Sequence, residues 1–324
     1  MANAEQIKAL IRSHADGDDT RFYALAMQMA AHAARSGHSR FAKELRKLVD
    51  SAREKSTTLE QQGRVLHIAQ PRGELAGILS VCSSSARLGD MALGSDVHAK
   101  LKRVISEQRS RGRLREHGLA PIRRLLLMGP PGTGKTLTAS ALAGELSLPL
   151  FTIQLDGLIT KYLGETAAKL RLLFEAIEQS RGVYLFDEFD ALGSQRGAGN
   201  DVGEIRRVLN SFLQFLEEDR SDSILVAATN HPGLLDSALF RRFDVLIEYA
   251  LPTKQIIREM IEARLCSFDW EGVRIDEAVD KAEGLSNAEI ARACEQAAKN
   301  AILRQSEVID HDELLLALEE RRLL

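Results

Sequence analysis

The chain has 324 residues, of which 44% are hydrophobic and 27% are charged, and its formal net charge is -3 at pH 7. This composition is typical of a globular protein that is long enough for two or three domains. The small negative charge gives no overall attraction to nucleic acid or to an anionic membrane, so neither is the expected partner.

The cysteines and the N-terminal sequence favour a cytoplasmic protein. The three cysteines are far apart and form no Cys-x-x-Cys pair: Cys82, Cys266 and Cys294. This spacing argues against a disulfide framework and against a zinc site. The first ten residues, MANAEQIKAL, lack the apolar core of a signal peptide, and no segment approaches the roughly 18 apolar residues that span a bilayer. We therefore expect a cytoplasmic protein without membrane insertion.

Residues 1–55 are predicted to form a small bundle of three helices. The segment is rich in good helix formers and contains no proline, and breaks at 15–19 and 36–38 separate the helices. Apolar residues recur at helical spacing, which favours a bundle core over a cofactor site. Residues 56–87 lose this periodicity and gain Gln, Gly and Ser, so they are predicted to be a linker with one short ordered stretch.

A strongly basic helix is predicted over residues 96–117. Its basic residues are Lys100, Lys102, Arg103, Arg109, Arg111, Arg113 and Arg115. No aromatic residues are interleaved with them, so a solvated helix face is the favoured interpretation, and a nucleic-acid groove is the alternative.

Strands and helices are predicted to alternate after this helix. The short apolar runs are 125–128, 150–153, 183–186, 224–228 and 245–247, and helical segments separate them. This alternation predicts an α/β fold, with a parallel sheet covered by helices on both faces. The remainder of the chain, from about 252, is predicted to be helical again and to form a smaller C-terminal domain.

A phosphate-binding loop is predicted at residues 129–136, which read GPPGTGKT and match the pattern G-x-x-x-x-G-K-[ST]. Glycines leave room for backbone N–H groups to surround phosphate oxygens. Lys135 adds a positive charge near the β and γ phosphates, and Thr136 offers a hydroxyl to Mg²⁺. The predicted nucleotide-binding residues here are Gly129, Pro130, Pro131, Gly132, Thr133, Gly134, Lys135, Thr136 and Leu137. The chain is therefore predicted to bind a nucleoside triphosphate.

Two carboxylates follow the apolar run 183–186, at the strand end where α/β sheets bind ligands. Asp187 and Glu188 after such a run are typical of a Walker B motif. Asp187 is predicted to hold Mg²⁺ through its water shell, together with the hydroxyl of Thr136. Glu188 is predicted to orient and polarise the attacking water, because phosphoryl transfer depends chiefly on positioning and charge stabilisation.

Three further polar residues are predicted to act in catalysis. Asn230 follows the run 224–228 and would offer an amide beside the γ phosphate at the same sheet edge. Arg241 and Arg242 are adjacent, and aromatic residues flank them at a predicted helix-to-strand junction. Arginines at such a place can reach the γ phosphate of a neighbouring subunit, and the rigid donor fork of arginine suits that anion.

In combination these motifs resemble the AAA clade of AAA+ ATPases, over roughly residues 88–324. The resemblance implies ATP and Mg²⁺ as ligands, a large nucleotide-binding subdomain at 88–251 and a helical lid at 252–324. The segment 284–290 is similar to the lid motif of that family, in which Gly284 and Ala288 would lie beside the nucleotide. Leu285 and Asn287 depart from the motif, and no sensor-2 arginine is assigned.

The family resemblance also assigns two loops and a clade. The segment 160–166 is similar to the first pore loop, and Lys161, Tyr162 and Leu163 would line the channel of a hexamer, where an aromatic ring can grip varied polypeptide. A second channel loop is expected near 197–204. The adjacent arginines are similar to those of the meiotic clade, which includes katanin, spastin and the ATPases that disassemble ESCRT filaments.

The favoured function is an ATP-hydrolysing remodeller, an unfoldase or disassembly motor that threads a protein substrate through a homohexamer. The helices at 1–55 are expected to bind the substrate or an adaptor. The sequence contains no His-Glu-x-x-His motif, so proteolysis would need a separately encoded protease as partner. Two alternatives stay open: a nucleotide-dependent scaffold or regulator of a partner such as a protease, and a nucleic-acid-linked AAA+ ATPase.

Overall fold

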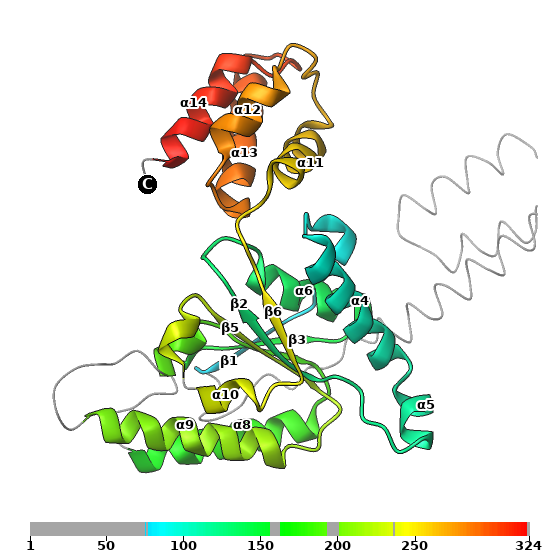
Figure 1. Ribbon diagram of the computed structural model, residues 1–324, viewed down its shortest axis with the longest axis vertical. Helices are drawn as coiled ribbons and strands as arrows, with labels where there is room; N and C mark the ends of the chain where they lie inside the picture. Colours follow the sequence, from blue (N-terminus) through cyan, green and yellow to red (C-terminus); the bar gives the residue numbers. More distant parts are fainter. Residues whose placement is uncertain (1–74, 76, 156–162, 193–200, 236, 323–324) are drawn as a thin grey trace, which may run out of the picture. The chain divides into compact units, whose positions relative to one another are not determined.

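A six-stranded sheet organises the part of the chain between residues 79 and 248 (Figure 1). This computed structural model describes residues 75, 77–155, 163–192, 201–235 and 237–322. The predicted helices of residues 1–55 therefore lie outside the described residues. The strands are β1 (Leu79–Cys82), β2 (Arg124–Met128), β3 (Leu150–Ile153), β4 (Val183–Phe186), β5 (Ile224–Thr229) and β6 (Val245–Glu248), and their order in the sheet is β1-β3-β4-β5-β2-β6.

All neighbouring strands except β1 and β3 run parallel. Strands β4 and β5 are buried at every position, so their continuous apolar runs reflect helices on both faces of the sheet. In Figure 1, helices α8 (Leu163–Gln179) and α9 (Asp201–Glu218) lie on one side of the sheet, and α4 (Ser95–Arg109) and α6 (Lys135–Leu146) lie on the other. The predicted α/β fold with a parallel sheet is confirmed.

Strand β1 lies inside the segment that was predicted to be a linker with one short ordered stretch. It pairs antiparallel with β3 at the edge of the sheet, in a register that places Leu79 opposite Ile153 and Cys82 opposite Leu150. These four residues form an ordered stretch inside 56–87, where one such stretch was expected, but its position and its pairing with β3 were not predicted. One reason is that β1 has only four residues, of which only Leu79 is buried, so its local pattern is weak and its long-range pairing with β3 decides its conformation.

The basic helix predicted over 96–117 is two helices in the structure. Helix α4 ends at Arg109, and α5 (Arg111–Glu116) begins after Ser110. Serine and glycine are weak helix formers, and the stretch at 110–112 contains one of each around Arg111, which explains the break. No residue of α5 is buried, whereas α4 packs on the core through Leu101 and Val104.

Two apolar clusters flank the sheet. On the side of α4 and α6, Leu101, Val104 and Leu142 pack with the buried residues of the strands. Under α8 and α9 the cluster is aromatic: the rings of Phe174, Phe186, Phe189, Phe212 and Phe215 contact one another at centroid distances of 5.0 to 6.5 Å. Such aromatic pairs add to the stabilisation that comes from burial alone.

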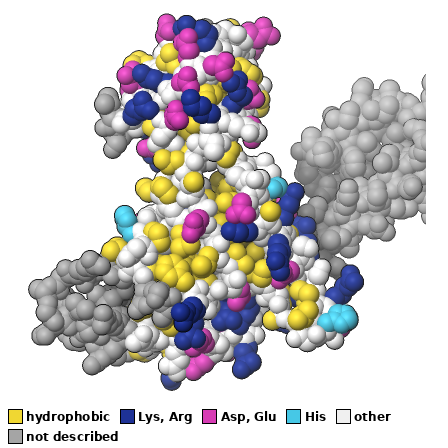
Figure 2. All heavy atoms as spheres, viewed as in Figure 1, with side chains coloured by type: hydrophobic (Ala, Val, Ile, Leu, Met, Phe, Trp, Pro, Cys, Tyr) yellow, Lys and Arg dark blue, Asp and Glu magenta, His cyan; other side chains and the backbone are white. Residues whose placement is uncertain are grey.

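The predicted helical C-terminal region is confirmed. It contains α11 (Lys254–Leu265), α12 (Ile275–Ala282), α13 (Asn287–Leu303) and α14 (His311–Arg322), which share a core of their own. Acidic and basic side chains are interspersed over its visible face (Figure 2), and some of them form ion pairs, such as Lys281 with Glu319 at 3.0 Å. Among the described residues, no helix is both long and apolar enough to cross a bilayer.

The smaller elements complete the chain between these parts. They are the 3-10 helices η2 (Leu88–Asp90), η3 (Phe189–Leu192) and η4 (Pro232–Leu234), and the short helix α10 (Ser237–Phe240). Helix α10 immediately precedes the adjacent arginines Arg241 and Arg242, and β6 follows them.

Gly144 in α6 tests the packing of the segment after β1. A Cβ at Gly144 would lie 2.1 Å from the backbone oxygen of Ala86, so alanine forces α6 and this segment apart. We expect Gly144→Ala to lower the free energy of unfolding by about 1 to 3 kcal/mol, although alanine is the better helix former. Urea unfolding measures this change.

Gly112 in α5 is the matched control, because a Cβ there would meet nothing within 4 Å. Gly112→Ala is expected to leave the free energy of unfolding unchanged or to raise it by up to ~1 kcal/mol through helix propensity. Equal effects of the two substitutions would contradict the close approach of Ala86 to Gly144.

Candidate nucleotide-binding site

The loop at 129–136 joins the end of β2 to the start of α6 at the carboxyl edge of the sheet. Gly129, Gly132 and Gly134 have φ values of 148, 75 and 100°, a region that favours glycine. A Cβ at Gly132 would lie 2.4 Å from Oγ of Ser286, so only glycine fits there. The loop therefore has the open backbone that a phosphate requires, at the N-terminus of a twelve-residue helix whose dipole favours an anion.

The side chain of Lys135 folds back over this loop. Its Nζ donates to the backbone oxygens of Gly129 at 2.8 Å and Pro130 at 2.7 Å. Burial lowers the pKa of Lys135, and the carboxylates of Asp187 and Asp190 partly oppose that shift. The ammonium of Lys135 thus donates to neutral carbonyl oxygens. A bound anion could replace these oxygens as its hydrogen-bond acceptor.

Thr136 and Asp187 come together as predicted for a metal site. Oγ1 of Thr136 donates to Oδ2 of Asp187 at 2.8 Å. A hydroxyl and a carboxylate are oxygen ligands of the kind that Mg²⁺ prefers, with the remaining positions filled by water and phosphate. The residues present therefore fit a magnesium ion at this point.

Glu188 has an unusual backbone conformation. Its φ is 51°, and among the described residues only Ser147 and Gln305 are other non-glycine residues with positive φ. Its N–H donates to Oδ1 of Asp187 at 3.0 Å. Backbone strain of this kind costs of the order of 1–3 kcal/mol and is concentrated at functional sites. The carboxylate of Glu188 is exposed and lies on the cavity wall.

Asp190 holds the end of β5 beside these groups. Its Oδ1 accepts from Oγ1 of Thr229 at 2.9 Å and from the N–H of Asn230 at 3.2 Å. Asn230 consequently lines the same cavity as Lys135 and Glu188. The sequence pattern gave Asp190 no role, although its place three residues after Asp187 was a usable signal.

A cavity of about 600 Å³ opens over the loop, within the size range of small-molecule sites. Its walls come from the segment before α4, from the loop and strand ends, and from α11 and α13. The lining residues that were not predicted are Gly89, Asp90, Met91, Ala92, Leu93, Glu259, Met260, Ala263, Arg264, Asn287 and Ala291. Several of them are apolar and suit the flat face of a nucleobase. They are scattered over three segments, so no local pattern identifies them.

The C-terminal helices contact the loop directly. The N–H of Ala288 donates to the oxygen of Gly132 at 2.9 Å, and Nδ2 of Asn287 donates to the oxygen of Ala92 at 3.2 Å. The side chain of Asn287 therefore joins α13 to the segment before α4. Gly284 is not among the lining residues, and its φ of 89° belongs to the turn before α13.

The two adjacent arginines lie outside this cavity. They precede β6, which runs parallel to β2, so they lie near the edge of the sheet opposite to the loop. Arg242 forms an ion pair with Glu217, whereas Arg241 is exposed and forms no hydrogen bond or ion pair with any residue that the structure describes. Within one chain these arginines and Lys135 do not converge.

The predicted channel residues are only partly described. Lys161 and Tyr162 lie outside the described residues, and Leu163 is the first residue of α8. Of the predicted second loop at 197–204, the first four residues also lie outside, and 201–204 begin α9. Both channel assignments stay predictions.

Comparison with known proteins agrees with this geometry. Residues 125–251 match the model of the ATPase family associated with various cellular activities (AAA). The chain is 34% identical over 323 residues to an uncharacterized AAA family ATPase, y4kL, of Sinorhizobium fredii, covering 99% of this chain and 96% of that protein.

Two further relatives are longer proteins. The chain is 33% identical over 267 residues to the ATP-dependent zinc metalloprotease FtsH 2 of Bdellovibrio bacteriovorus, covering 76% of this chain and 43% of that protein. It is 33% identical over 273 residues to the FtsH of Pseudomonas putida, covering 78% of this chain and 44% of that protein. The chain therefore matches less than half the length of these metalloproteases.

Lys135 and Glu188 are expected to separate binding from hydrolysis. Lys135→Ala removes charge-assisted hydrogen bonds worth ~1.5–3 kcal/mol, which weakens nucleotide affinity about tenfold to a hundredfold. Glu188→Gln keeps the cavity but removes the carboxylate that is predicted to activate water, so we expect affinity to be retained and the hydrolysis rate to fall by at least ~10²-fold.

Titration with a fluorescent ATP analogue and single-turnover release of phosphate measure these two effects. Hydrolysis at the normal rate by Glu188→Gln would contradict the role of Glu188. Unchanged affinity in Lys135→Ala would contradict the phosphate-binding role of the loop.

Proposed function

Because the chain belongs to the AAA family of ATPases, it hydrolyses ATP, and we propose that it uses this reaction as a homohexameric protein remodeller. The proposal joins three steps: an ATP site within each chain, its completion by a second chain, and the transfer of motion to a bound polypeptide.

The first step is supported by the contacts around the loop. Thr136 and Asp187 would hold Mg²⁺, which supplies positive charge to the phosphate oxygens when it is bound. Lys135 adds a second positive charge, and Asn230 presents an amide at the same edge. Glu188 would accept a hydrogen bond from the attacking water and orient it. These groups converge on one cavity, as catalysis by positioning and charge stabilisation requires.

The position of the adjacent arginines is the observation that carries the second step. They lie near the opposite edge of the sheet from Lys135, and no contact within the described chain directs them to the cavity. In a ring, that edge of one subunit can meet the loop edge of the next. Arg241 would then reach the γ phosphate held by a neighbour, a contribution that can reach about 10³ to 10⁵ in rate. AAA ATPases generally oligomerise, and six is the number that we propose here.

The third step is supported by the sequence and by the relatives. Tyr162 belongs to a segment similar to a pore loop, and the FtsH relatives are named as ATP-dependent proteases. The present sequence contains no His-Glu-x-x-His motif. We therefore propose that the chain unfolds or disassembles a protein that residues 1–55 recruit directly or through an adaptor. A separate protease would be a partner and not a part of this chain.

The nucleic-acid alternative loses support from the contacts of the basic helices. Arg109 pairs with Glu145 at 2.8 Å, and Arg115 pairs with Asp222. Two of the basic residues that suggested a groove are therefore already neutralised by acids of the same chain.

Tyr162→Ala tests the threading step. We expect the variant to hydrolyse ATP within about twofold of the wild-type rate, because Tyr162 is not one of the residues predicted to bind ATP, but to lose unfolding of a tagged fluorescent substrate. The substrate is a green fluorescent protein fused to an unstructured tail. Loss of fluorescence under single-turnover conditions is measured.

Tyr162→Phe is the matched control, because it keeps the aromatic ring and loses only the hydroxyl. It is expected to unfold the substrate at nearly the wild-type rate. If Tyr162→Ala unfolds its substrate or controls a partner as well as wild type does, threading is wrong and the regulator alternative is favoured.

A further inference from the structure

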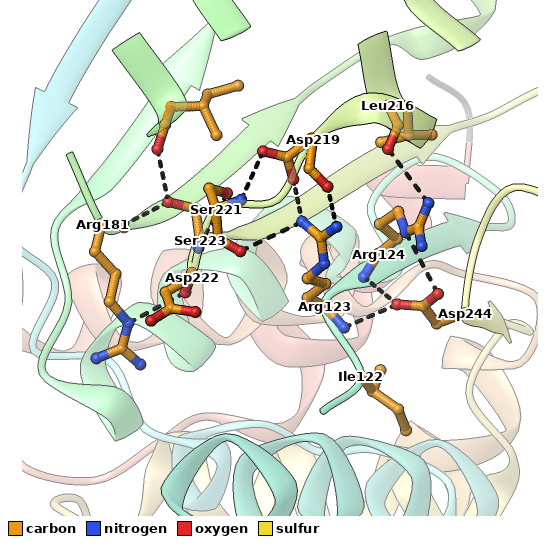
Figure 3. Close-up of polar contacts among 12 residues, drawn as sticks. Ile122, Arg123, Arg124, Arg181, Leu216, Asp219, Ser221, Asp222, Ser223 and Asp244 are labelled. Atoms are coloured by element: carbon orange, nitrogen blue, oxygen red, sulfur yellow. Dashed lines mark hydrogen bonds and ion pairs between the residues drawn. The ribbon is translucent and has the colours of Figure 1, made fainter. Parts of the chain in front are cut away.

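The turn that carries the adjacent arginines is bound to the start of β2 and to the residue before it. We call residues 241–244 the arginine turn. It follows α10 and leads into β6, the strand next to β2. Figure 3 shows its last residue, Asp244, directed at the backbone of Arg123, which precedes β2, and at the backbone and side chain of Arg124, the first residue of β2.

Asp244 makes four contacts with this short stretch. Its Oδ2 accepts from the N–H of Arg123 at 3.0 Å and from the N–H of Arg124 at 2.9 Å. Its Oδ1 lies 3.4 Å from Nε of Arg124, and its own N–H donates to the oxygen of Arg124 at 2.9 Å. One carboxylate therefore fixes the end of the arginine turn to β2 through both backbone and side chain.

The partner arginines are themselves fixed. Arg124 donates to the oxygen of Leu216 at 3.2 Å, and Arg123 forms an ion pair with Asp219, whose side chain is fully buried. Nε of Arg124 is buried and has no hydrogen-bond partner, so the charge of Asp244 beside it is its only compensation among the described residues. Asp244 is thus bound to two arginines that are themselves bound at the end of α9.

From these contacts we infer that Asp244 is a positioning residue for Arg241. The inference rests on the proposed function, in which Arg241 completes the ATP site of a neighbouring chain. Arg241 has no partner among the described residues, and its backbone lies three residues from Asp244. The contacts of this carboxylate fix the position of the backbone of the arginine turn. The side chain of Arg241 then extends from a fixed backbone position toward the neighbour's phosphate.

The size of the effect follows from the geometry of catalysis. Displacing a stabilising group by about 1 Å can cost 10²-fold in rate without any loss of substrate binding. Asp244 is not among the residues that line the cavity of its own chain. Loss of its carboxylate should therefore change kcat and leave the affinity for ATP unchanged.

The test uses Asp244→Ala and Asp244→Asn in the full-length oligomer. Asp244→Ala removes all side-chain contacts and is expected to lower kcat by about 10²-fold, with KM for ATP within about twofold of wild type. Asp244→Asn keeps an oxygen for the two N–H groups and loses only the charge beside Arg124, so its loss should be smaller. If Asp244→Ala does not fold, as judged by its melting temperature, Asp244→Asn carries the same comparison.

Asp222→Asn is the matched control. Asp222 is also a carboxylate paired with an arginine, Arg115, but among the described residues it forms no hydrogen bond or ion pair with the arginine turn. Its kcat and KM are expected to equal those of wild type.

Two further measurements separate positioning from general damage. The double variant Arg241→Ala with Asp244→Ala should be no slower than Arg241→Ala alone, because Asp244 acts through Arg241. Mixing Asp244→Ala with Lys135→Ala protomers should restore part of the turnover, because the second protomer supplies an intact arginine turn to the intact cavity of the first.

Each failure has its own meaning. Additive loss in the double variant, no recovery on mixing, or a normal kcat for Asp244→Ala beside a slow Arg241→Ala would overturn the positioning role alone. Normal hydrolysis by Arg241→Ala would instead overturn the shared site of the proposed function, and the inference about Asp244 would fall with it.

Discussion

The polarity of the parallel sheet is the constraint on which the rest of this structure depends. Strands β2, β4 and β5 all end at one edge, and their last residues lead directly to the phosphate loop, to Asp187 and to Asn230. The same polarity puts the start of β6, and the arginines before it, near the opposite edge. One chain therefore cannot bring its arginines to its own ATP site without breaking the sheet.

In the assembly that we propose, a second chain would supply the arginines that the first chain cannot bring to its own ATP site. The loop edge of one copy and the arginine edge of another carry complementary charge: carboxylates with a bound phosphate on one side, and a fork of arginine donors on the other. Hydrolysis would then depend on assembly, which is useful for a motor because each site senses its neighbour. The contacts of Asp244 fit this arrangement, because an arginine that acts across an interface requires a backbone that is held in a fixed position.

Contacts near Gly132 tie the ATP site to the C-terminal helices. Ser286 lies so close to Gly132 that a side chain there would collide with it, and Ala288 donates a hydrogen bond to the same glycine. A group that enters the cavity therefore touches both the loop and α13. Binding and loss of a phosphate can change these contacts, and this is a direct route from chemistry to movement of the helices.

The local patterns of the sequence predict much of this arrangement. The bounds of β3 and β4 match the predicted runs, because each is a short and mostly apolar segment. The phosphate loop is a contiguous motif, within which Lys135 donates to the oxygen of Gly129, and Thr136 donates to Asp187. The features that could not be predicted depend on contacts between segments that are distant in the sequence. Strand β1 is formed by pairing with β3, and the side chain of Asn287 donates to the oxygen of Ala92.

The dependence of the specific ATPase activity on protein concentration tests the central claim most directly. The activity per chain is measured over a wide concentration range, and the molecular mass is followed by sedimentation in the same buffer with ATP. A shared site predicts that activity per chain rises with assembly and reaches a plateau when assembly is complete. Full activity per chain at concentrations where the protein sediments as a monomer would contradict it.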